Sequence, residues 1–241
     1  MSRADCDDGF AGALEPGALE QDDVIARARD YARAHLLHDR TGHGMDHANR
    51  VARTAERLAR EEGVDPLLPV LAAYLHDTVD EKLVDNRERA VQELRSFLEK
   101  IDLPAADAHD VVYTVTHMSF ADGLAGEAGA AAAQPLSKSG QITQDADRLD
   151  AIGAVGVVRA VYYGGAHGER IYDPAVSPRG NMTRDEYRDL SNETVVNHFY
   201  EKLLTLKDAL NTEAARRVAE RRHAFMVSFL EEFKAEWEGR A

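Results

Sequence analysis

Apolar residues recur at every third or fourth position through most of the chain, which is the spacing that places them on one face of an α-helix. The pattern begins at Val24 and gives four predicted helices in the first hundred residues: 24–39, 48–64, 65–83 and 86–101. The third is apolar on nearly every side from Leu67 to Leu75, as is typical of the central helix of a bundle. Pro104 opens a fifth helical segment, which runs to Phe120.

The pattern changes twice in the second half of the chain. Residues 121–141 are rich in Gly, Ala and Ser, and we interpret them as a surface loop. A helix is predicted over 142–165, with a break at Gly164-Gly165. A second loop follows at 165–182, and its segment 166–174 is a candidate lid over a pocket.

Two long helices, 184–210 and 212–237, are predicted to finish the chain. No run of alternating apolar and polar residues indicates a strand, so the predicted class is all-α. Residues 1–23 carry seven acids against one Arg, and we expect a poorly ordered acidic tail there. The length of 241 residues is then accounted for by one domain over 24–241.

Composition and charge exclude several classes of protein. Asp and Glu number 43 against 29 Lys and Arg, and the net charge of −14 argues against binding to nucleic acid or anionic membranes. The single cysteine, Cys6, excludes a disulfide framework within one chain and fits a reducing compartment. We find no signal peptide and no membrane span, and we therefore expect a cytoplasmic protein.

His76 and Asp77 directly follow the most apolar helix, and two more acids, Asp80 and Glu81, come just after them. Burying such groups is costly unless something compensates their charge, and a bound cation would do so. Imidazole and carboxylate together suit Mn, Fe, Zn, Co or Mg, whereas the lack of thiolates argues against a structural zinc site. A polar cluster that ends the helix in water is the alternative interpretation.

Further candidate ligands lie on two other predicted helices. His47 heads an amphipathic helix and His43 lies four residues earlier, although the Glu of the H-E-x-x-H zinc motif is missing. Asp145, Asp147 and Asp150 occur within six residues. Asp147 lies beside the apolar stripe of its helix, so we favour it as the ligand, with Asp150 as the substitute.

Taken in order, His47, His76-Asp77 and Asp147 resemble the H…HD…D signature of the HD-domain superfamily of metal-dependent phosphohydrolases. The longer strings GHGMDHANRV, LAAYLHDTVDEK, THMSF, TQDADRLDAIGAVGVVRAVYYGG and HFYEKLLTLKDALNTEAARRVAERR resemble bacterial HD proteins of the YpgQ/YedJ type, which are nucleotide pyrophosphohydrolases. The resemblance covers residues 24–238. It implies an HD-domain helical bundle with a metal core over 35–165 and C-terminal helices over 184–238 packed on it.

The resemblance also implies roles for individual residues. It assigns four metal ligands: His47, His76, Asp77 and Asp147. The string HDTVDE is similar to HDTVED of the guanosine tetraphosphate hydrolases, where the two acids after the pair help to position or activate water. Asp80 and Glu81 occupy these places in swapped order, which leaves open which of them is the catalytic acid or base.

An ion held by two imidazoles and two carboxylates keeps coordination positions open, where it can acidify water and neutralise charge on phosphorus. The remaining phosphate charge requires cationic side chains. The candidate substrate-binding residues are Arg50, Lys82, His117, Lys138, Arg148 and Lys202. His198 is a further pocket candidate.

The expected function is hydrolysis of (deoxy)nucleoside triphosphates to the monophosphate and pyrophosphate. The expected cofactor is a divalent metal (Mn, Mg, Co, Fe, Ni or Zn), with Mn or Mg favoured. A phosphomonoesterase or phosphodiesterase that acts on another small phosphate compound would use the same metal cage. A non-catalytic HD module that binds a nucleotide is the third alternative, and the sequence leaves homo-oligomer formation open.

Overall fold

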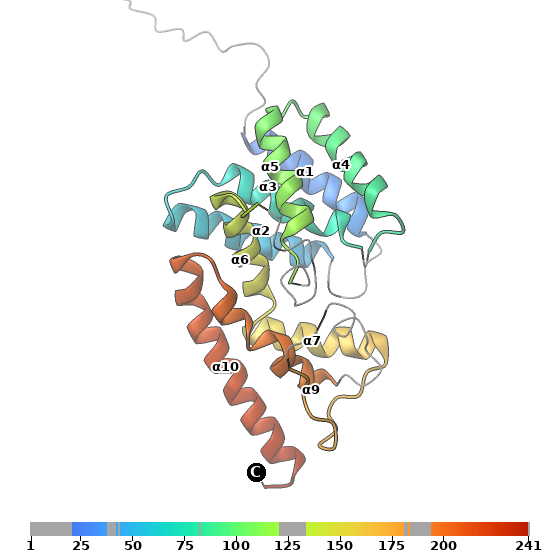
Figure 1. Cartoon of the computed structure of the whole chain (residues 1–241), viewed down its shortest axis with the longest axis vertical. Coiled ribbons are helices and arrows are strands. Elements are labelled where there is room, and N and C mark those ends of the chain that lie inside the picture. Colours follow the sequence, from blue (N-terminus) through green and yellow to red (C-terminus); the bar gives the residue numbers. More distant parts are fainter. Residues whose placement is uncertain are drawn as a thin grey trace, which may run out of the picture.

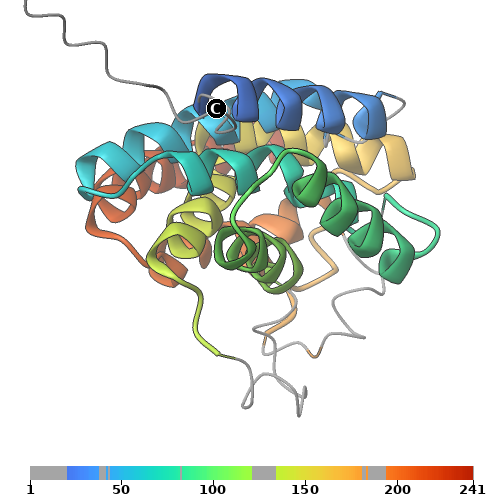
Figure 2. The ribbon, with the colours of Figure 1, turned by 90° about the horizontal axis from the view of Figure 1, so that it is seen from above.

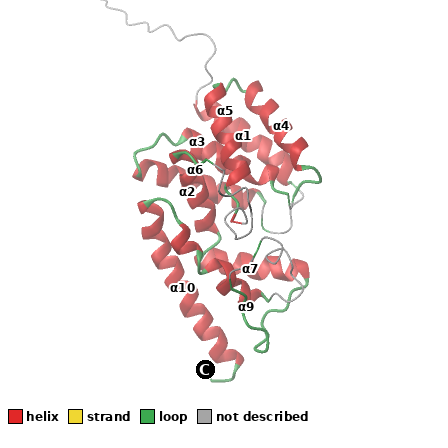
Figure 3. Cartoon of the chain, in the orientation of Figure 1, coloured by secondary structure: helices red, strands yellow, loops and turns green. Residues whose placement is uncertain are grey.

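The computed structural model describes residues 21–37, 42, 44–81, 83–120, 134–180, 183 and 194–240. Every regular element within these ranges is helical, and an isolated parallel bridge joins Arg170 to Thr194 (Figure 3). The predicted all-α class is therefore confirmed. None of the described helices combines the length and the apolar character that crossing a membrane requires.

The first group of elements forms the upper part of the molecule in Figure 1. It consists of α1 (Gln21–Leu36), α2 (Met45–Glu61), α3 (Leu67–Leu75), the 3₁₀ turn η1 (His76–Val79), α4 (Arg87–Lys100), α5 (Ala105–His117) and α6 (Lys138–Asp150). The predicted acidic tail over 1–23 is wrong for its last three residues, because Gln21 already begins α1, and residues 1–20 lie outside the described residues. Asp22 and Asp23 stabilise the first turn of α1, where negative charge is favourable.

Helix α3 lies at the centre of this group, as its apolar sequence predicts. Its residues from Pro69 to Leu75 are buried, and it packs against α1, α2, α5 and α6 (Figure 2). Leu71 and Leu75 are fully buried among side chains of the surrounding helices. Because η1 continues from α3 without a break, His76 and Asp77 are carried into the interior at the end of the central helix.

The second group forms the lower part of Figure 1. It consists of α7 (Gly153–His167), α9 (Val195–His198), the π-helical turn η3 (Phe199–Leu203), the 3₁₀ turn η4 (Leu206–Ala209) and α10 (Glu213–Trp237). Helix α10 packs along α6 and α7 and also contacts α2. The prediction of a long last helix starting at Thr212 is confirmed, with Thr212 as its N-cap.

A buried carboxylate on α6 holds the start of α10. Asp145 is fully buried and accepts hydrogen bonds from the backbone N–H and side-chain amide of Asn211, at 2.8 and 2.9 Å, and from the N–H and hydroxyl of Thr212, at 2.8 and 2.7 Å. These four hydrogen bonds compensate the charge of the Asp145 carboxylate, so Asp145 is not available as a metal ligand. They also join α6, in the first group of helices, to the start of α10, in the second.

The region around α6 and α7 differs from the prediction. The predicted loop over 121–141 is too long, because Ser137 caps α6 and the helix begins at Lys138; residues 121–133 lie outside the described residues. The predicted single helix over 142–165 is wrong, because the chain turns sharply at Ile152 and Gly153, whose φ is +79°.

The predicted break at Gly164-Gly165 is also wrong, since α7 runs through both glycines to His167. A Cβ on Gly164 would lie 2.4 Å from Cγ2 of Val195, so that glycine permits close packing against α9 and does not end the helix.

The predicted long helix over 184–210 is wrong within its described part. Thr194 is extended and pairs with Arg170, and short helical turns follow it up to Ala209. The backbone N–H groups of Val195 and Val196 donate to the carbonyls of Arg170 and Ile171. These bonds attach the segment to the 168–180 connection, and the residues 184–193 lie outside the described residues.

Candidate metal centre

Four side chains from three helical elements converge below the end of α3. Nε2 of His47, in the first turn of α2, lies 3.2 Å from Nε2 of His76, the first residue of η1. An oxygen of Asp147, in the last turn of α6, lies 3.4 Å from the first of these nitrogens and 3.8 Å from the second. The carboxylate of Asp77 lies 3.5 Å and 3.2 Å from the same two atoms.

The hydrogen bonds of the two imidazoles leave their Nε2 atoms facing this cluster. Nδ1 of His76 lies 2.8 Å from the carbonyl of Ala73, which can only accept, so this nitrogen carries the hydrogen. Nδ1 of His47 lies 2.7 Å from Oδ2 of Asp150. Each ring is therefore fixed from behind and presents its other nitrogen to the centre, as metal-binding histidines do.

The chemistry of the four groups fits a divalent cation. His47, His76 and Asp77 are buried, and Oδ2 of Asp77 has no hydrogen-bond partner among the described residues. A buried carboxylate oxygen without a partner is costly, and a cation bound among these atoms would remove the cost. One donor atom from each of His47, His76 and Asp147 lies within 4.8 Å of the others, and two nitrogens with carboxylate oxygens suit a first-row divalent metal.

The pKa shifts of these groups show that the cluster favours positive charge. Burial alone would lower the pKa of His47, but hydrogen bonds with Asp147 and Asp150 outweigh burial and raise it to about 9. Burial opposes ionisation of Asp147 as well, but His47 and His76 hold the pKa of its carboxyl well below the usual range. A proton on His47 thus supplies part of the positive charge that a metal ion would supply.

Asp150, expected as a substitute ligand, lies behind His47 and does not face the cluster. Its carboxylate accepts the Nδ1 contact and two bonds from Arg50, Nε to Oδ1 at 2.8 Å and Nη2 to Oδ2 at 3.0 Å. Arg159, on α7, adds a third bond at 2.9 Å. Arg50 also donates to Asp46 at 2.8 Å, so its guanidinium, expected to bind substrate, is directed at carboxylates.

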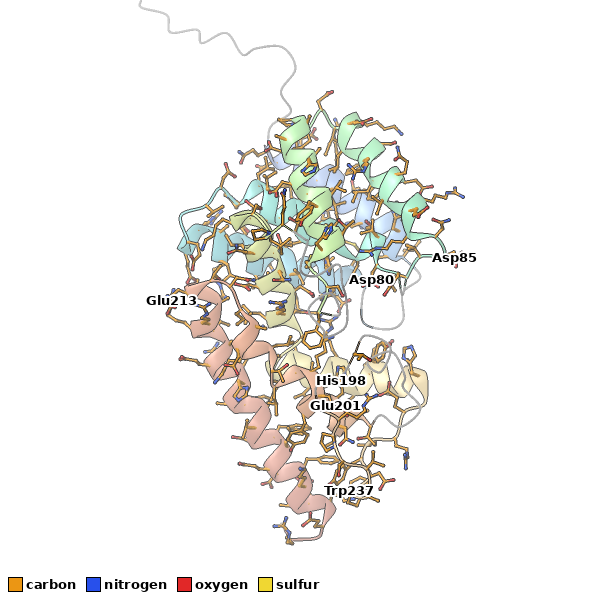
Figure 4. All side chains as sticks on the ribbon, viewed as in Figure 1. Asp80, Asp85, His198, Glu201, Glu213 and Trp237 are labelled. Atoms are coloured by element: carbon orange, nitrogen blue, oxygen red, sulfur yellow. The ribbon has the colours of Figure 1, made fainter. Side chains whose placement is uncertain are left out.

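Asp80 and Glu81 follow η1, the turn that carries His76 and Asp77. Helical structure ends at Val79, and Asp80 is extended, with its N–H donating to the carbonyl of Asp77 at 3.3 Å. Asp80 is half-buried, whereas Glu81 is exposed. In Figure 4, Asp80 lies at the lower margin of the upper helices, and His198 and Glu201 lie among the lower elements.

The candidate substrate-binding cations are not gathered at one place. Nζ of Lys202, on η3, lies 5.3 Å from the ring centre of Phe120, which follows α5. The exposed His117, at the end of α5, contacts the carbonyl of Tyr113 through Nδ1 at 2.9 Å. These two residues come from elements on either side of the junction between the two groups of helices, and Lys82 lies outside the described residues.

The structure places the other two candidates away from the centre. Lys138 pairs with Glu62 at 2.8 Å and lies at the opposite end of α6 from Asp147, about 13 Å along the helix axis. Arg148 donates to the carbonyl of Ala209, so its guanidinium points to the C-terminal segment although its neighbour Asp147 faces the metal centre.

Sequence reasoning missed one ion pair, which joins η3 to the connection at a point beyond the candidate lid over 166–174. Glu201, on η3, has a side chain that is 3% exposed, and it accepts from the backbone N–H of Arg179 at 2.8 Å and from its Nη2 at 2.6 Å. Asn197 donates to the carbonyl of Val176 at 3.0 Å. The connection that contains the predicted lid is therefore held against η3 and α9.

Comparison with known proteins identifies a family model and a relative that match this chain. The family model of the HD domain matches residues 44–152, which span α2 to the end of α6. The chain is 36% identical over 211 residues to the protein YpgQ of Bacillus subtilis (strain 168), and the match covers 88% of this chain and 92% of YpgQ.

Several solved structures resemble most of the chain. A crystal structure of a Lactobacillus plantarum protein is 44% identical, with a TM-score of 0.79, and the match covers 90% of this chain and 98% of that one. B. subtilis YpgQ in complex with ADP is 32% identical, with a TM-score of 0.71 and coverage of 90% and 96%. An HD-superfamily hydrolase from Bacillus thuringiensis is 34% identical, with a TM-score of 0.69 and coverage of 91% and 99%.

Proposed function

The chain belongs to the HD superfamily of hydrolases, and from that membership and the geometry of its metal centre we propose a divalent-metal-dependent phosphohydrolase that cleaves nucleoside triphosphates to the monophosphate and pyrophosphate. The single observation that carries the proposal is the convergence of His47, His76, Asp77 and Asp147, whose positions along the chain are separated by 29 and 70 residues. The favoured metals are Mn and Mg, because half of the donor set is hard carboxylate oxygen.

In this proposal each of the four side chains supplies a ligand to the cation. The two Nε2 atoms and the oxygens of Asp77 and Asp147 are the ligands. A divalent cation bound by them supplies Lewis acidity, which neutralises charge on phosphate and makes water a better nucleophile. Asp147 has the most exposed side chain of the four, at 34%, so the phosphate chain reaches the centre from its side.

The acids that follow η1 are proposed to handle the attacking water. Asp80 is half-buried, and its backbone N–H donates to the carbonyl of Asp77, which keeps the backbones of the two residues close together. Either Asp80 or Glu81 could accept the proton of the water or orient it for attack. Lys202 and His117, on facing elements of the junction, are proposed to neutralise the phosphate oxygens that the metal does not contact.

Two observations favour a nucleotide as the substrate. The structure of the relative YpgQ was solved in complex with ADP, and the match covers 90% of the present chain. The net charge of −14 would repel long polyanions, whereas a small nucleotide needs only the local field of the metal centre.

The test is a product assay on the purified chain with Mn²⁺ and a panel of ribo- and deoxyribonucleoside triphosphates. We expect one pyrophosphate and one monophosphate for each triphosphate consumed, with no orthophosphate before a pyrophosphatase is added. The variant His76→Ala, which removes a proposed ligand, is the matched control and should be inactive. Release of orthophosphate with a diphosphate product would contradict the pyrophosphohydrolase reaction, and inertness of the metal-loaded chain toward all phosphate compounds would contradict the enzyme.

A further inference from the structure

A line of contacts runs from α7, outside the residues that match the HD domain, to the metal centre. Nη1 of Arg159 lies 2.9 Å from Oδ2 of Asp150, and the same oxygen lies 2.7 Å from Nδ1 of His47. Nε2 of His47 faces the cluster of proposed ligands. Three helices, α7, α6 and α2, each supply one member of this line.

The line is well shielded from solvent. The side chains of His47 and Asp150 are 1% and 5% exposed, and that of Arg159 is 19% exposed. Arg50 fixes the Asp150 carboxylate from a second direction through two bonds. With three guanidinium bonds on it, the carboxylate has a defined orientation, and its remaining strong contact is the imidazole.

We propose that Asp150 is a positioning residue that orients the His47 ring for metal binding, and that Arg159 extends this control to α7, so that the C-terminal helices help to set the affinity of the metal centre. An ionised carboxylate only accepts hydrogen bonds, so it keeps the hydrogen on Nδ1 and the lone pair of Nε2 toward the metal. The proposal rests on the proposed function in one respect, that His47 is a ligand.

The competing role for Arg159 is direct contact with substrate phosphate. That role predicts a higher KM after its substitution with no change in metal affinity. A role through Asp150 predicts the opposite, a loss of metal affinity that disappears once Asp150 has itself been replaced. The two roles are therefore separable by measuring Mn²⁺ binding without substrate.

The first experiment measures Mn²⁺ affinity by titration calorimetry of the metal-free full chain and of Asp150→Asn. This substitution keeps the shape of the side chain, but the asparagine amide can turn its NH₂ group toward Nδ1 of His47. The imidazole ring would then no longer be held in one orientation. We expect affinity to fall about 10- to 100-fold, the usual effect of losing such a partner of a metal-binding histidine. Asp145→Asn is the matched control, because Asp145 is a buried carboxylate of the same helix whose described hydrogen bonds go to Asn211 and Thr212 at the start of α10.

A second readout follows the ring directly. In the chain loaded with diamagnetic Zn²⁺, the Nδ1 proton of His47 should give a slowly exchanging, strongly downfield NMR signal, because the proton is buried between the ring and a carboxylate. The signal should be lost or shifted in Asp150→Asn and retained in Asp145→Asn. General destabilisation of the fold would not produce this difference.

The third experiment is a double-mutant cycle of Mn²⁺ affinity with Arg159→Gln and Asp150→Asn. We expect Arg159→Gln alone to weaken binding about three- to tenfold, with partial recovery in Arg159→Lys, and to have no further effect in the Asp150→Asn background. Arg217→Gln is the control, because Arg217 also joins the C-terminal helices to α2, by an exposed pair with Glu61 at 3.1 Å that is remote from the ligands.

The outcomes separate this inference from the proposed function. If the unsubstituted chain binds Mn²⁺ and Asp150→Asn binds it equally well, the positioning role is wrong and the metal centre stands. If Arg159→Gln changes only KM, the link to α7 is wrong. If the unsubstituted chain binds no divalent metal, both the metal centre and the positioning role are wrong.

Discussion

Nε2 of His47 and Nε2 of His76 lie 3.2 Å apart, although 29 residues separate the two histidines. Both rings are held through Nδ1, by Asp150 and by the carbonyl of Ala73, so both Nε2 atoms face the cluster of proposed ligands. Two buried imidazole nitrogens this close need a proton or a cation between them. The contact is the central feature of the proposed metal centre.

The first prediction concerns Asp77, whose Oδ2 is buried without a hydrogen-bond partner among the described residues. Asp77→Ala removes a proposed ligand and should abolish both stoichiometric metal binding and turnover. Metal content of the purified, Mn²⁺-equilibrated variant, measured by mass spectrometry, checks the first part. Retention of one metal per chain with normal affinity would show that Asp77 is not a ligand.

The second prediction concerns metal removal and replacement. Chelation should abolish phosphohydrolase activity, and Mn²⁺, Co²⁺ or Mg²⁺ should restore it. Carboxylate oxygens suit Mg²⁺ and Mn²⁺, whereas the two imidazoles favour the later transition metals. Activity that persists after exhaustive chelation, with metal analysis below one-tenth of an equivalent, would contradict a metal-dependent mechanism.

The proposed ligand set could be derived from the sequence because each proposed ligand belongs to a recognisable local motif. His76-Asp77 ends an apolar helix, and Asp147 lies in a string of three closely spaced acids. Those motifs needed no knowledge of how the helices pack. The order of the motifs then resembled a known signature, which connected residues far apart in the sequence.

The contact between Arg159 and Asp150 could not be predicted in the same way. In the single helix expected over 142–165, nine residues correspond to 900° of rotation, which would place the two side chains on opposite faces. The turn at Ile152 and Gly153 reverses that relationship and brings Arg159 back to within 2.9 Å of Asp150. A positive φ at a glycine leaves no periodic signal, so the sequence pattern missed it.

The third prediction uses the two adjacent glycines of α7. Gly164→Ala places a Cβ 2.4 Å from Cγ2 of the buried Val195, and this overpacking should destabilise the fold by about 1–3 kcal/mol. Gly165→Ala meets no atom within 4 Å and should stabilise the helix by about 0.5–1 kcal/mol, because alanine loses less backbone entropy on folding.

Thermal unfolding of the two variants, measured with the same metal content, tests the pair. Opposite shifts of Tm are expected. Equal shifts would mean that α7 does not pack against Val195 as described, and would support the helix break that the sequence pattern suggested at these glycines.

The last prediction separates the two acids that follow η1. Asp80→Asn and Glu81→Gln keep the shape of the side chain and remove the ability to accept a proton. The variant at the acid that handles water should keep its metal and its substrate affinity, while turnover falls about 10²- to 10⁴-fold, the usual size of a general-base contribution. Steady-state kinetics at saturating Mn²⁺ measures both quantities.

The structure gives a reason to favour Asp80 over Glu81 as the residue that handles the water. A shared helical face with Asp77, three residues earlier, would require the helix to continue, but it ends at Val79 and Asp80 is extended. Burial favours Asp80, because Asp80 is half-buried, whereas Glu81 is exposed and more strongly solvated. We therefore expect the larger loss of turnover in Asp80→Asn. Near-normal turnover in both variants, with metal content unchanged, would mean that neither carboxylate accepts the proton and that the metal alone activates the water.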